Sequence, residues 1–281
     1  MRDMQAKETA LLERLRDIAA TAERTDGTGK TVAVAYSGGL DSRFVIHMAQ
    51  RAGLAVRALH VNGPHIPAHE HAGAVGWADR TGVPLTVITL DPLGMPALRT
   101  NPPDRCYHCK KAIFAALRDA AGGLPLCDGT NASDLVEYRP GLRALSELAV
   151  RSPLAETGIG KEDIRAIGKT SGLENPGQAA QPCLLTRFGY GAALAPALLR
   201  GVDAAEAAVQ KALAAQGAPN AAFRVRYEDA ATPALHLDRR FFTDTPPVSL
   251  QRALKDALET AGFPNAPIRL MDSLSGYFDR A

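Results

Sequence analysis

The segment "VAVAYSGGLDSRFVIHMAQRAG", Val32 to Gly53, decides the fold, because it predicts a strand, a tight turn and a helix in direct succession. It opens with a short apolar run, which is typical of a buried parallel strand. Phe44, Val45 and Met48 then share one apolar helix face. The glycines between them allow a ligand to approach the backbone closely, and the helix begins with unpaired N–H groups. We therefore expect this turn to hold an anion.

Strands and helices alternate along the first 180 residues. This alternation favours an α/β fold with a doubly wound parallel sheet, in which ligands bind beyond the carboxyl ends of the strands. The loops "SGGLDS", "DPLGMP" and "DGTNASD" should therefore open onto one edge of the sheet. The expected strands cover residues 31–36, 55–62, 84–90 and 124–130.

A second, smaller domain is predicted after "ENPGQAAQPC", a stretch rich in Gly, Pro and Gln that has the composition of a linker. Beyond it the pattern gives an Ala-rich helix, two strands, an amphipathic helix and a last strand. The chain has 281 residues, a length that suits two modest domains. We expect an α/β domain at 1–180 and a smaller α+β domain at 186–281, which serves assembly and closes over a substrate.

Charge and composition argue against several classes of protein. Lysine and arginine total 32 against 30 acidic residues, so no basic excess indicates tRNA or another nucleic acid as the substrate. No apolar run approaches the ~18 residues of a membrane-spanning helix. The charged, amphipathic start does not resemble a signal peptide. We therefore expect a cytoplasmic protein that does not bind membranes.

The glycine turn offers hydroxyl groups, backbone amides and one acid. Ser37 and Ser42 supply the hydroxyls, while Gly38 and Gly39 permit close backbone approach. Asp41 would repel a bare phosphate, so it favours Mg²⁺ held together with phosphate oxygens. These five residues are the candidate binding site. The alternative is a turn in which Asp41 or Ser42 only caps the helix.

A second polar loop, "DGTNASD", follows the last predicted strand of the sheet. Gly129, Thr130, Asn131 and Asp134 should lie near the same ligand, because the carboxyl ends of parallel strands share one edge. Asp134 is a candidate for a second metal ligand or a ribose ligand. Its alternative role is to cap the turn that follows.

Cysteine spacing points to metal or redox chemistry. Cys106 and Cys109 form a C-x-x-C pair at the start of a predicted helix, and Cys183 lies in "QPCLLTRFGYG". Three thiolates can hold a 4Fe–4S cluster and leave one iron open. Zinc remains a rival, with His108 or His65 as a further ligand, and so does a redox pair.

Other reactive residue types have plainer explanations. Cys127 lies in an apolar strand and is expected to be buried. Four histidines fall within twelve residues, and we favour ordinary loop and helix positions for them over metal ligation: His60, His65, His69 and His71. Four arginines are candidates for binding an anionic substrate, with surface ion pairs as the alternative: Arg105, Arg139, Arg143 and Arg187.

Together these stretches resemble one family. "SGGLDS" resembles the ATP loop of the PP-loop ATP pyrophosphatases, whose fold is adenine nucleotide alpha hydrolase-like. Behind it come "NPPDRCYHCKKAIF", "DGTNASDLVEYRPGLRALSE", "RSPLAETGIGKEDIRAIGKTSGLENPG" and "CLLTRFGYG", in the order found in the LarE sulfur transferases. The resemblance covers about residues 8–195 and implies ATP and Mg²⁺ at the glycine turn.

The resemblance also implies a reaction. LarE enzymes adenylate a carboxylate of pyridinium biscarboxylic acid mononucleotide, release pyrophosphate and convert the carboxylate to a thiocarboxylate for the nickel-pincer nucleotide. The sulfur comes from a 4Fe–4S cluster on three cysteines, here Cys106, Cys109 and Cys183, or from one sacrificed cysteine, here Cys183. The catalytic residues would be Cys183, Asp41 and Arg187. A small anionic nucleotide as substrate, a sulfur-donor protein and a homo-oligomer are expected.

Two stretches, "GQAAQPC" and "MDSLSGYFDRA", depart from the family pattern, which leaves the acceptor of sulfur open. The alternative functions are another PP-loop reaction, either by a tRNA thiolase or by an amide-forming ligase, and a nucleotide-binding sensor without turnover.

Overall fold

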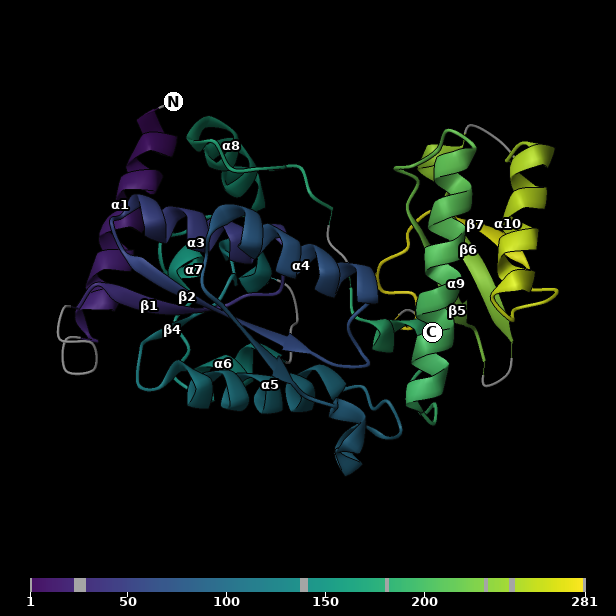
Figure 1. Cartoon of the computed structure of the whole chain (residues 1–281), viewed down its shortest axis with the longest axis horizontal. Helices are drawn as coiled ribbons and strands as arrows, with labels where there is room; N and C mark the ends of the chain where they lie inside the picture. Colours follow the sequence, from purple (N-terminus) through teal and green to yellow (C-terminus); the bar gives the residue numbers. More distant parts are fainter. Residues whose placement is uncertain are drawn as a thin grey trace. The chain divides into compact units, whose positions relative to one another are not determined.

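The computed structural model describes residues 2–22, 29–136, 141–179, 182–229, 232–242 and 246–279 (Figure 1). The candidate Arg139 lies outside these residues. The chain divides into two compact units, the first made of Met1–Gly63, Glu70–Leu90 and Asp104–Gln181. Two short segments that the sequence placed in the first domain, Pro64–His69 and Asp91–Pro103, group with the second unit, as does Pro182–Ala281.

The first unit contains a four-stranded parallel sheet in the order β3-β2-β1-β4. Its strands are β1 (Thr31–Ala35), β2 (Ala55–Asn62), β3 (Leu85–Thr89) and the short β4 (Leu126–Cys127). The chain runs from β1 outward to β3 and then crosses back to β4, so the order reverses between β1 and β4. This reversal is the position at which open α/β sheets bind ligands. The predicted doubly wound α/β fold is confirmed.

Helices cover both faces of this sheet, because each strand alternates its side chains between two apolar cores. Val32 and Val34 of β1 face a core built with α1 and α3, whereas Ala33 faces a core built with α5. In Figure 1, α3 lies on one side of the sheet and α5 on the other. The helices of the first unit are α1 (Arg2–Ala20), α3 (Leu40–Arg51), α4 (Ala68–Thr81), α5 (Arg105–Ala121), α6 (Gly141–Glu147), α7 (Pro153–Glu156) and α8 (Lys161–Ser171).

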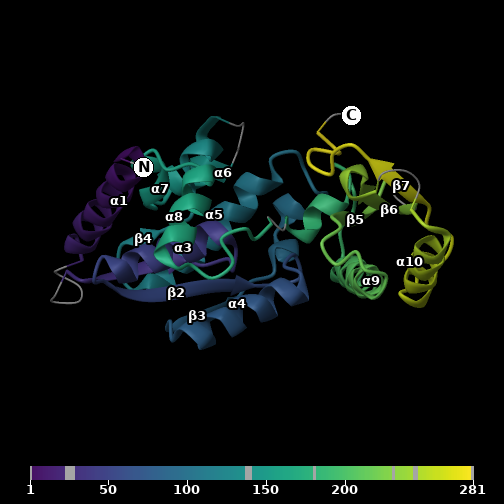
Figure 2. The same ribbon diagram turned by 90° about the horizontal axis from the view of Figure 1, so that it is seen from above.

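The second unit is the expected smaller α+β fold. Strands β5 (Phe223–Tyr227), β6 (Pro233–Asp238) and β7 (Ile268–Met271) form one sheet. β5 pairs with β6 antiparallel, and β6 pairs with β7 parallel. Helices α9 (Pro196–Ala215) and α10 (Val248–Thr260) pack side by side against this sheet around a shared apolar core (Figure 2).

The remaining described elements are short turns of 3-10 helix, at Pro92–Gly94, Pro96–Leu98, Ala132–Val136, Leu184–Arg187 and Arg239–Phe241. Among the helices that the structure describes, none combines the length and the apolar character needed to cross a bilayer.

Candidate functional site

The glycine turn connects β1 to α3 and is tied by its own serines. The backbone N–H of Ser37 donates to Oγ of Ser42 at 3.3 Å, and Oγ of Ser42 donates to the carbonyl of Gly39 at 3.0 Å. Gly38 adopts φ +83°, a left-handed conformation that suits glycine. Gly39 is the N-cap of α3, so no side chain caps the helix from that position. The sequence-predicted residues of the turn therefore present backbone amides and hydroxyls together.

The loop after β4 packs directly onto this turn. The side-chain amide of Asn131 donates to Oδ2 of Asp41 at 3.2 Å. A β-carbon added to Gly129 would lie 2.8 Å from the backbone nitrogen of Ser42. Asn131 is fully buried, so this junction is rigidly placed. The structure thus brings the two sequence-predicted loops together at the point where the strand order reverses.

Two buried acids, Asp128 and Asp134, accept hydrogen bonds that hold the second loop. Asp128 accepts hydrogen bonds from the hydroxyls of Thr130 and of Ser152, the latter at 2.7 Å. Burial raises the pKa of Asp128, and these hydrogen bonds and Lys110 oppose the rise. Asp134 lies within the 3-10 turn Ala132–Val136 and accepts from the backbone N–H of Asn131 at 3.2 Å. Its role as a metal ligand, a ribose ligand or a cap of the following turn stays a prediction.

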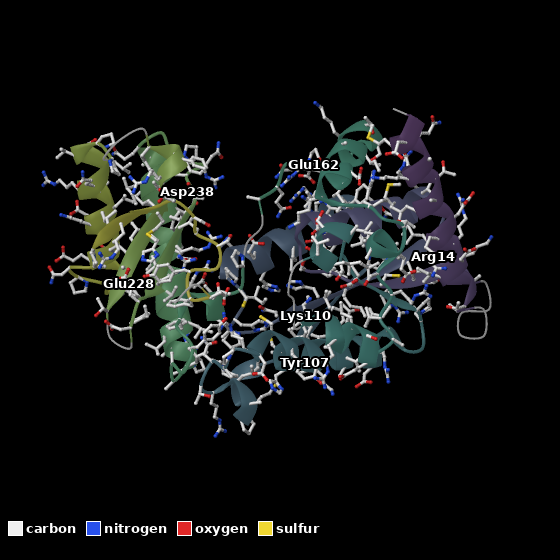
Figure 3. The ribbon with its side chains drawn as sticks, turned by 180° about the vertical axis from the view of Figure 1, so that it is seen from behind. Arg14, Tyr107, Lys110, Glu162, Glu228 and Asp238 are labelled. Carbon is white, nitrogen blue, oxygen red and sulfur yellow. The ribbon has the colours of Figure 1, made fainter. Side chains whose placement is uncertain are left out.

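The C-x-x-C pair lies in the first turn of α5, close to the second loop. Cys106 is exposed and Cys109 is buried, and their spacing of three residues puts both thiols on one side of the helix. Lys110, which acts electrostatically on Asp128, follows the second cysteine (Figure 3). Complete burial raises the pKa of the Cys127 thiol to about 12. It is the buried core residue that the sequence predicted.

The third candidate cysteine, Cys183, belongs to the second unit. Its side chain is half-buried, and its carbonyl accepts from the hydroxyl of Thr186 at 2.8 Å. Arg187 is buried, with 1% of its side chain exposed, and its guanidinium grips both carboxylate oxygens of Glu206 at 2.7 and 2.9 Å. The same guanidinium donates to the carbonyls of Pro182 and Cys183. Arg187 therefore holds the cysteine segment in place.

Thiol donors for a metal centre are present, yet they are divided between the two units. Among the described residues, no group of three or more His, Cys, Asp or Glu side chains is arranged to hold a metal ion. The exposed thiol of Cys106 beside Cys109 is chemically suited to an iron–sulfur cluster that a third thiolate completes. The grouping of Cys106 and Cys109 with Cys183 stays a prediction.

The other arginine candidates differ in exposure. Arg105 is buried at the start of α5. Arg143 is exposed, pairs with Glu147 at 2.8 Å and stacks over the ring of Tyr107, which is the surface ion pair that the sequence gave as its alternative.

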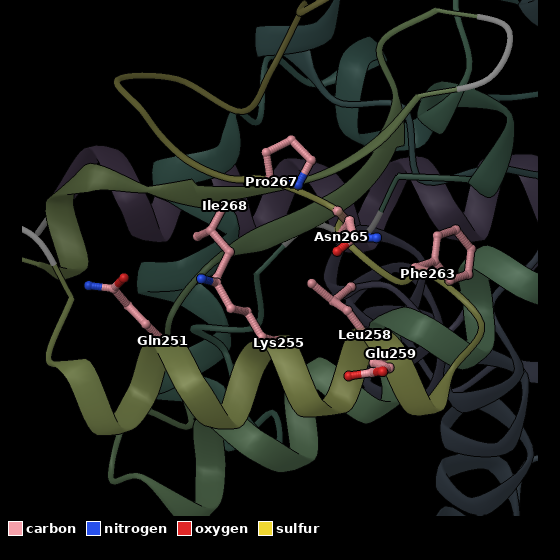
Figure 4. Close-up of a pocket in the computed structure, with 9 residues that line it drawn as sticks. Gln251, Lys255, Leu258, Glu259, Phe263, Asn265, Pro267 and Ile268 are labelled. Carbon is pink, nitrogen blue, oxygen red and sulfur yellow. The ribbon is translucent and has the colours of Figure 1, made fainter.

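A separate pocket of about 440 Å³ lies in the second unit between α10 and β7, lined by Lys255, Glu259, Ile268 and their neighbours (Figure 4). It contains none of the sequence-predicted site residues.

Comparison with known proteins identifies relatives of the chain by sequence. No protein-family model matches the chain. A protein of Lactiplantibacillus plantarum named pyridinium-3,5-bisthiocarboxylic acid mononucleotide synthase is 32% identical over 234 residues, which are 82% of this chain and 79% of the relative. That synthase is LarE. The chain belongs to the LarE family.

Two uncharacterized proteins align with shorter parts of this LarE-family chain. A protein of Synechocystis is 36% identical over 177 residues, which are 62% of the chain and 66% of the relative. A protein of Methanocaldococcus jannaschii is 35% identical over 164 residues, which are 57% of the chain and 62% of the relative. The chain therefore covers slightly less than two thirds of the length of each of these two relatives.

The sequence of this LarE-family protein did not predict one set of hydrogen bonds that holds the glycine turn. Arg43, in α3, donates to the carbonyl of Glu174 at 2.8 Å and also bonds the side chain of Gln178. Gln178 in turn donates to the carbonyl of Gly38 at 3.3 Å. The start of "ENPGQAAQPC" is therefore bound to the first unit and is no free linker there. A buried arginine in an apolar helix face was the signal that could have suggested such a partner.

Proposed function

We propose that the chain is an ATP-dependent sulfur transferase, which adenylates a carboxylate of a small anionic nucleotide and replaces one of its oxygens with sulfur. The observation that supports this most directly is the junction of the two loops, in which Asn131 bonds Asp41 and Gly129 packs on Ser42. That junction concentrates amide donors and one acid at a single edge of the sheet. A triphosphate with Mg²⁺ fits this donor set.

Adenylation needs the α-phosphorus of ATP to be presented to the carboxylate. A carboxylate oxygen attacks this phosphorus, the bond to the bridging oxygen breaks, and pyrophosphate leaves with the electron pair. The turn amides and the hydroxyl of Ser37 would hold the departing pyrophosphate, and Asp41 would hold Mg²⁺ against it. Preorganised donors of this kind stabilise developing charge without reorganising during the reaction.

Sulfur transfer follows on the activated acyl group. A sulfur nucleophile attacks the acyl carbon, and AMP leaves with the oxygen. A 4Fe–4S cluster held by Cys106, Cys109 and Cys183 would supply the sulfur when bound; zinc is the alternative metal, and sacrifice of the Cys183 sulfur is the alternative source. Arg187 would keep the Cys183 segment in position through its bonds to the backbone carbonyls.

Nucleotide binding and pyrophosphate release test the first half of this proposal. Titration calorimetry with ATP and Mg²⁺ should detect binding that Asp41→Asn weakens about tenfold or more, since the variant loses the charge that favours the metal. Asp17→Asn is the matched control, because Asp17 is an exposed acid of α1. Wild-type protein that binds no ATP, or an Asp41→Asn variant with full affinity, would contradict the proposal.

Iron content tests the second half. After anaerobic reconstitution, the wild type should hold about four iron atoms per chain, and Cys106→Ala should hold far fewer. Cys127→Ala is the control, because that thiol is buried in the core. Mass spectrometry of Cys183 after turnover separates the two sulfur sources, since a sacrificed cysteine loses about 34 Da. A protein with full activity, one zinc and no iron would exclude the cluster.

A further inference from the structure

Two histidines beside the glycine turn form a pair that the proposed function does not use. His60 lies at the carboxyl end of β2 and is 1% exposed, while His71 lies in α4 and is half-buried. Nε2 of His60 is 3.0 Å from Nδ1 of His71, and the rings stack with centroids 5.1 Å apart. The sequence favoured ordinary loop and helix positions over metal ligation for these residues, and it did not predict that the two rings meet.

The hydrogen bonds determine where each proton lies in the neutral pair. Nδ1 of His60 lies 2.9 Å from the carbonyl of Tyr36, and a carbonyl only accepts, so Nδ1 carries the proton. Nε2 of His60 is then an acceptor, and Nδ1 of His71 must donate to it. Neutral His71 is left with a bare Nε2, which can only accept a hydrogen bond. Burial lowers the pKa of His60, which keeps this first ring neutral.

The pair stands next to the turn. Tyr36, whose carbonyl holds His60, directly precedes Ser37, and its hydroxyl donates to the carbonyl of Ala74 at 3.0 Å. A β-carbon added to Gly38 would lie 2.9 Å from Cβ of Ala74. His71 precedes Ala74 by three residues and so shares its helix face. Nε2 of His71 makes no hydrogen bond to any residue that the structure describes.

We propose that His71 selects the base of the nucleotide, by accepting a hydrogen bond from the exocyclic 6-amino group of adenine. This inference rests on the proposed binding of ATP at the turn. On the base of ATP, the amino group is the only N–H donor, because the other ring nitrogens and the phosphates accept. Inosine triphosphate has a carbonyl at the same position, so two acceptors would face each other. His60 acts through His71 and is a positioning residue.

Affinities for ATP and inosine triphosphate, measured with Mg²⁺ on the full chain at about pH 8, test the proposal. The wild type should prefer ATP about tenfold, and His71→Ala should reduce this ratio to about one to threefold, because it weakens ATP binding and leaves inosine triphosphate bound at least as tightly as before. His71→Gln, which keeps an acceptor oxygen, should restore part of the preference. His60→Phe fills the same space but cannot accept the hydrogen bond that fixes the tautomer of His71. Its ratio of affinities should lie between those of the wild type and of His71→Ala.

The control is His47→Ala, because His47 is a half-buried histidine of α3 whose ring is hydrogen-bonded to the hydroxyl of Ser171 at 2.9 Å. It should leave the ratio unchanged. Wild-type protein that binds neither nucleotide would refute the proposed function. ATP binding with a ratio that His71→Ala does not alter would refute the role of His71 alone. If His71→Ala weakens the binding of ATP and of inosine triphosphate equally, the role of His71 is also refuted. The same holds if deoxy analogues show that the preference depends on the ribose hydroxyls.

Discussion

Substituting Gly129 by alanine should destabilise the first unit and weaken the proposed nucleotide site, because the added methyl group meets backbone atoms. The new β-carbon would lie 2.8 Å from the nitrogen of Ser42 and 3.0 Å from the carbonyl carbon of Asp41. Ordinary contact begins at 3.4 Å, so the start of α3 must retreat by about 0.6 Å. Neither atom belongs to a flexible side chain that could swing away.

The cost follows from this displacement. Overpacking at a rigid contact lowers the free energy of unfolding by about 1–3 kcal/mol. For a unit of this size, each kcal/mol corresponds to a fall in Tm of about 2–4 °C. The hydrogen bond from Asn131 to Asp41 is already 3.2 Å long, and the same retreat would break it. Affinity for ATP with Mg²⁺ should therefore drop about tenfold or more.

Urea unfolding and titration calorimetry measure the two effects. Gly73→Ala is the matched control, since Gly73 lies inside α4 with nothing within 4 Å of an added β-carbon. That variant should be slightly more stable, by about 0.5–1 kcal/mol, because alanine favours a helix over glycine. If Gly129→Ala unfolds at the same urea concentration as the wild type and binds ATP equally well, the contact between the two loops does not constrain the site.

Two further predictions concern the second unit. Burial lowers the pKa of His65 to about 4, so the unfolded chain binds an extra proton between about pH 6.5 and 4, and stability should fall as pH decreases through that window. His65→Leu should flatten the dependence of urea unfolding on pH there, and an unchanged slope would contradict the assignment. Arg187→Ala should destabilise the unit by about 3–5 kcal/mol, since it leaves Glu206 buried without its cation. The exposed Arg200→Ala is its control, and equal Tm values for the two variants would show that the buried pair contributes nothing.

Local sequence chemistry was enough to predict the sheet and the meeting of the two loops. The apolar run before Ser37 and the glycine pair after it specify a strand and a turn without reference to the rest of the chain. Once the strands are parallel, the loops after β1 and β4 must share an edge, which is why Asn131 reaches Asp41. The fold and the contact between the two loops therefore followed from short-range patterns and the parallel order of the strands.

The sequence could not supply contacts that depend on where distant side chains arrive. Arg43 and Gln178 are 135 residues apart, and nothing in either local pattern names the other. His60 and His71 are close in sequence, yet one is on a strand and the other on a helix, so only the packing of α4 against β1 and β2 brings their rings together. The assignment of Pro64–His69 and Asp91–Pro103 to the second unit is likewise a property of packing.

The glycine turn is held from three directions, which bears on the anion binding that we propose for it. Ala74 of α4 approaches Gly38, Gly129 approaches Ser42, and Gln178 bonds the carbonyl of Gly38. Gly38 is required by its backbone conformation, because its φ of +83° is unfavourable for residues with a side chain. Gly129 has no such conformation, and it is required because a β-carbon there would collide with the backbone of Asp41 and Ser42. A turn fixed in this way keeps its shape before a ligand arrives. If the turn binds a triphosphate as we propose, binding loses little conformational entropy, and the turn would hold the departing pyrophosphate without rearranging.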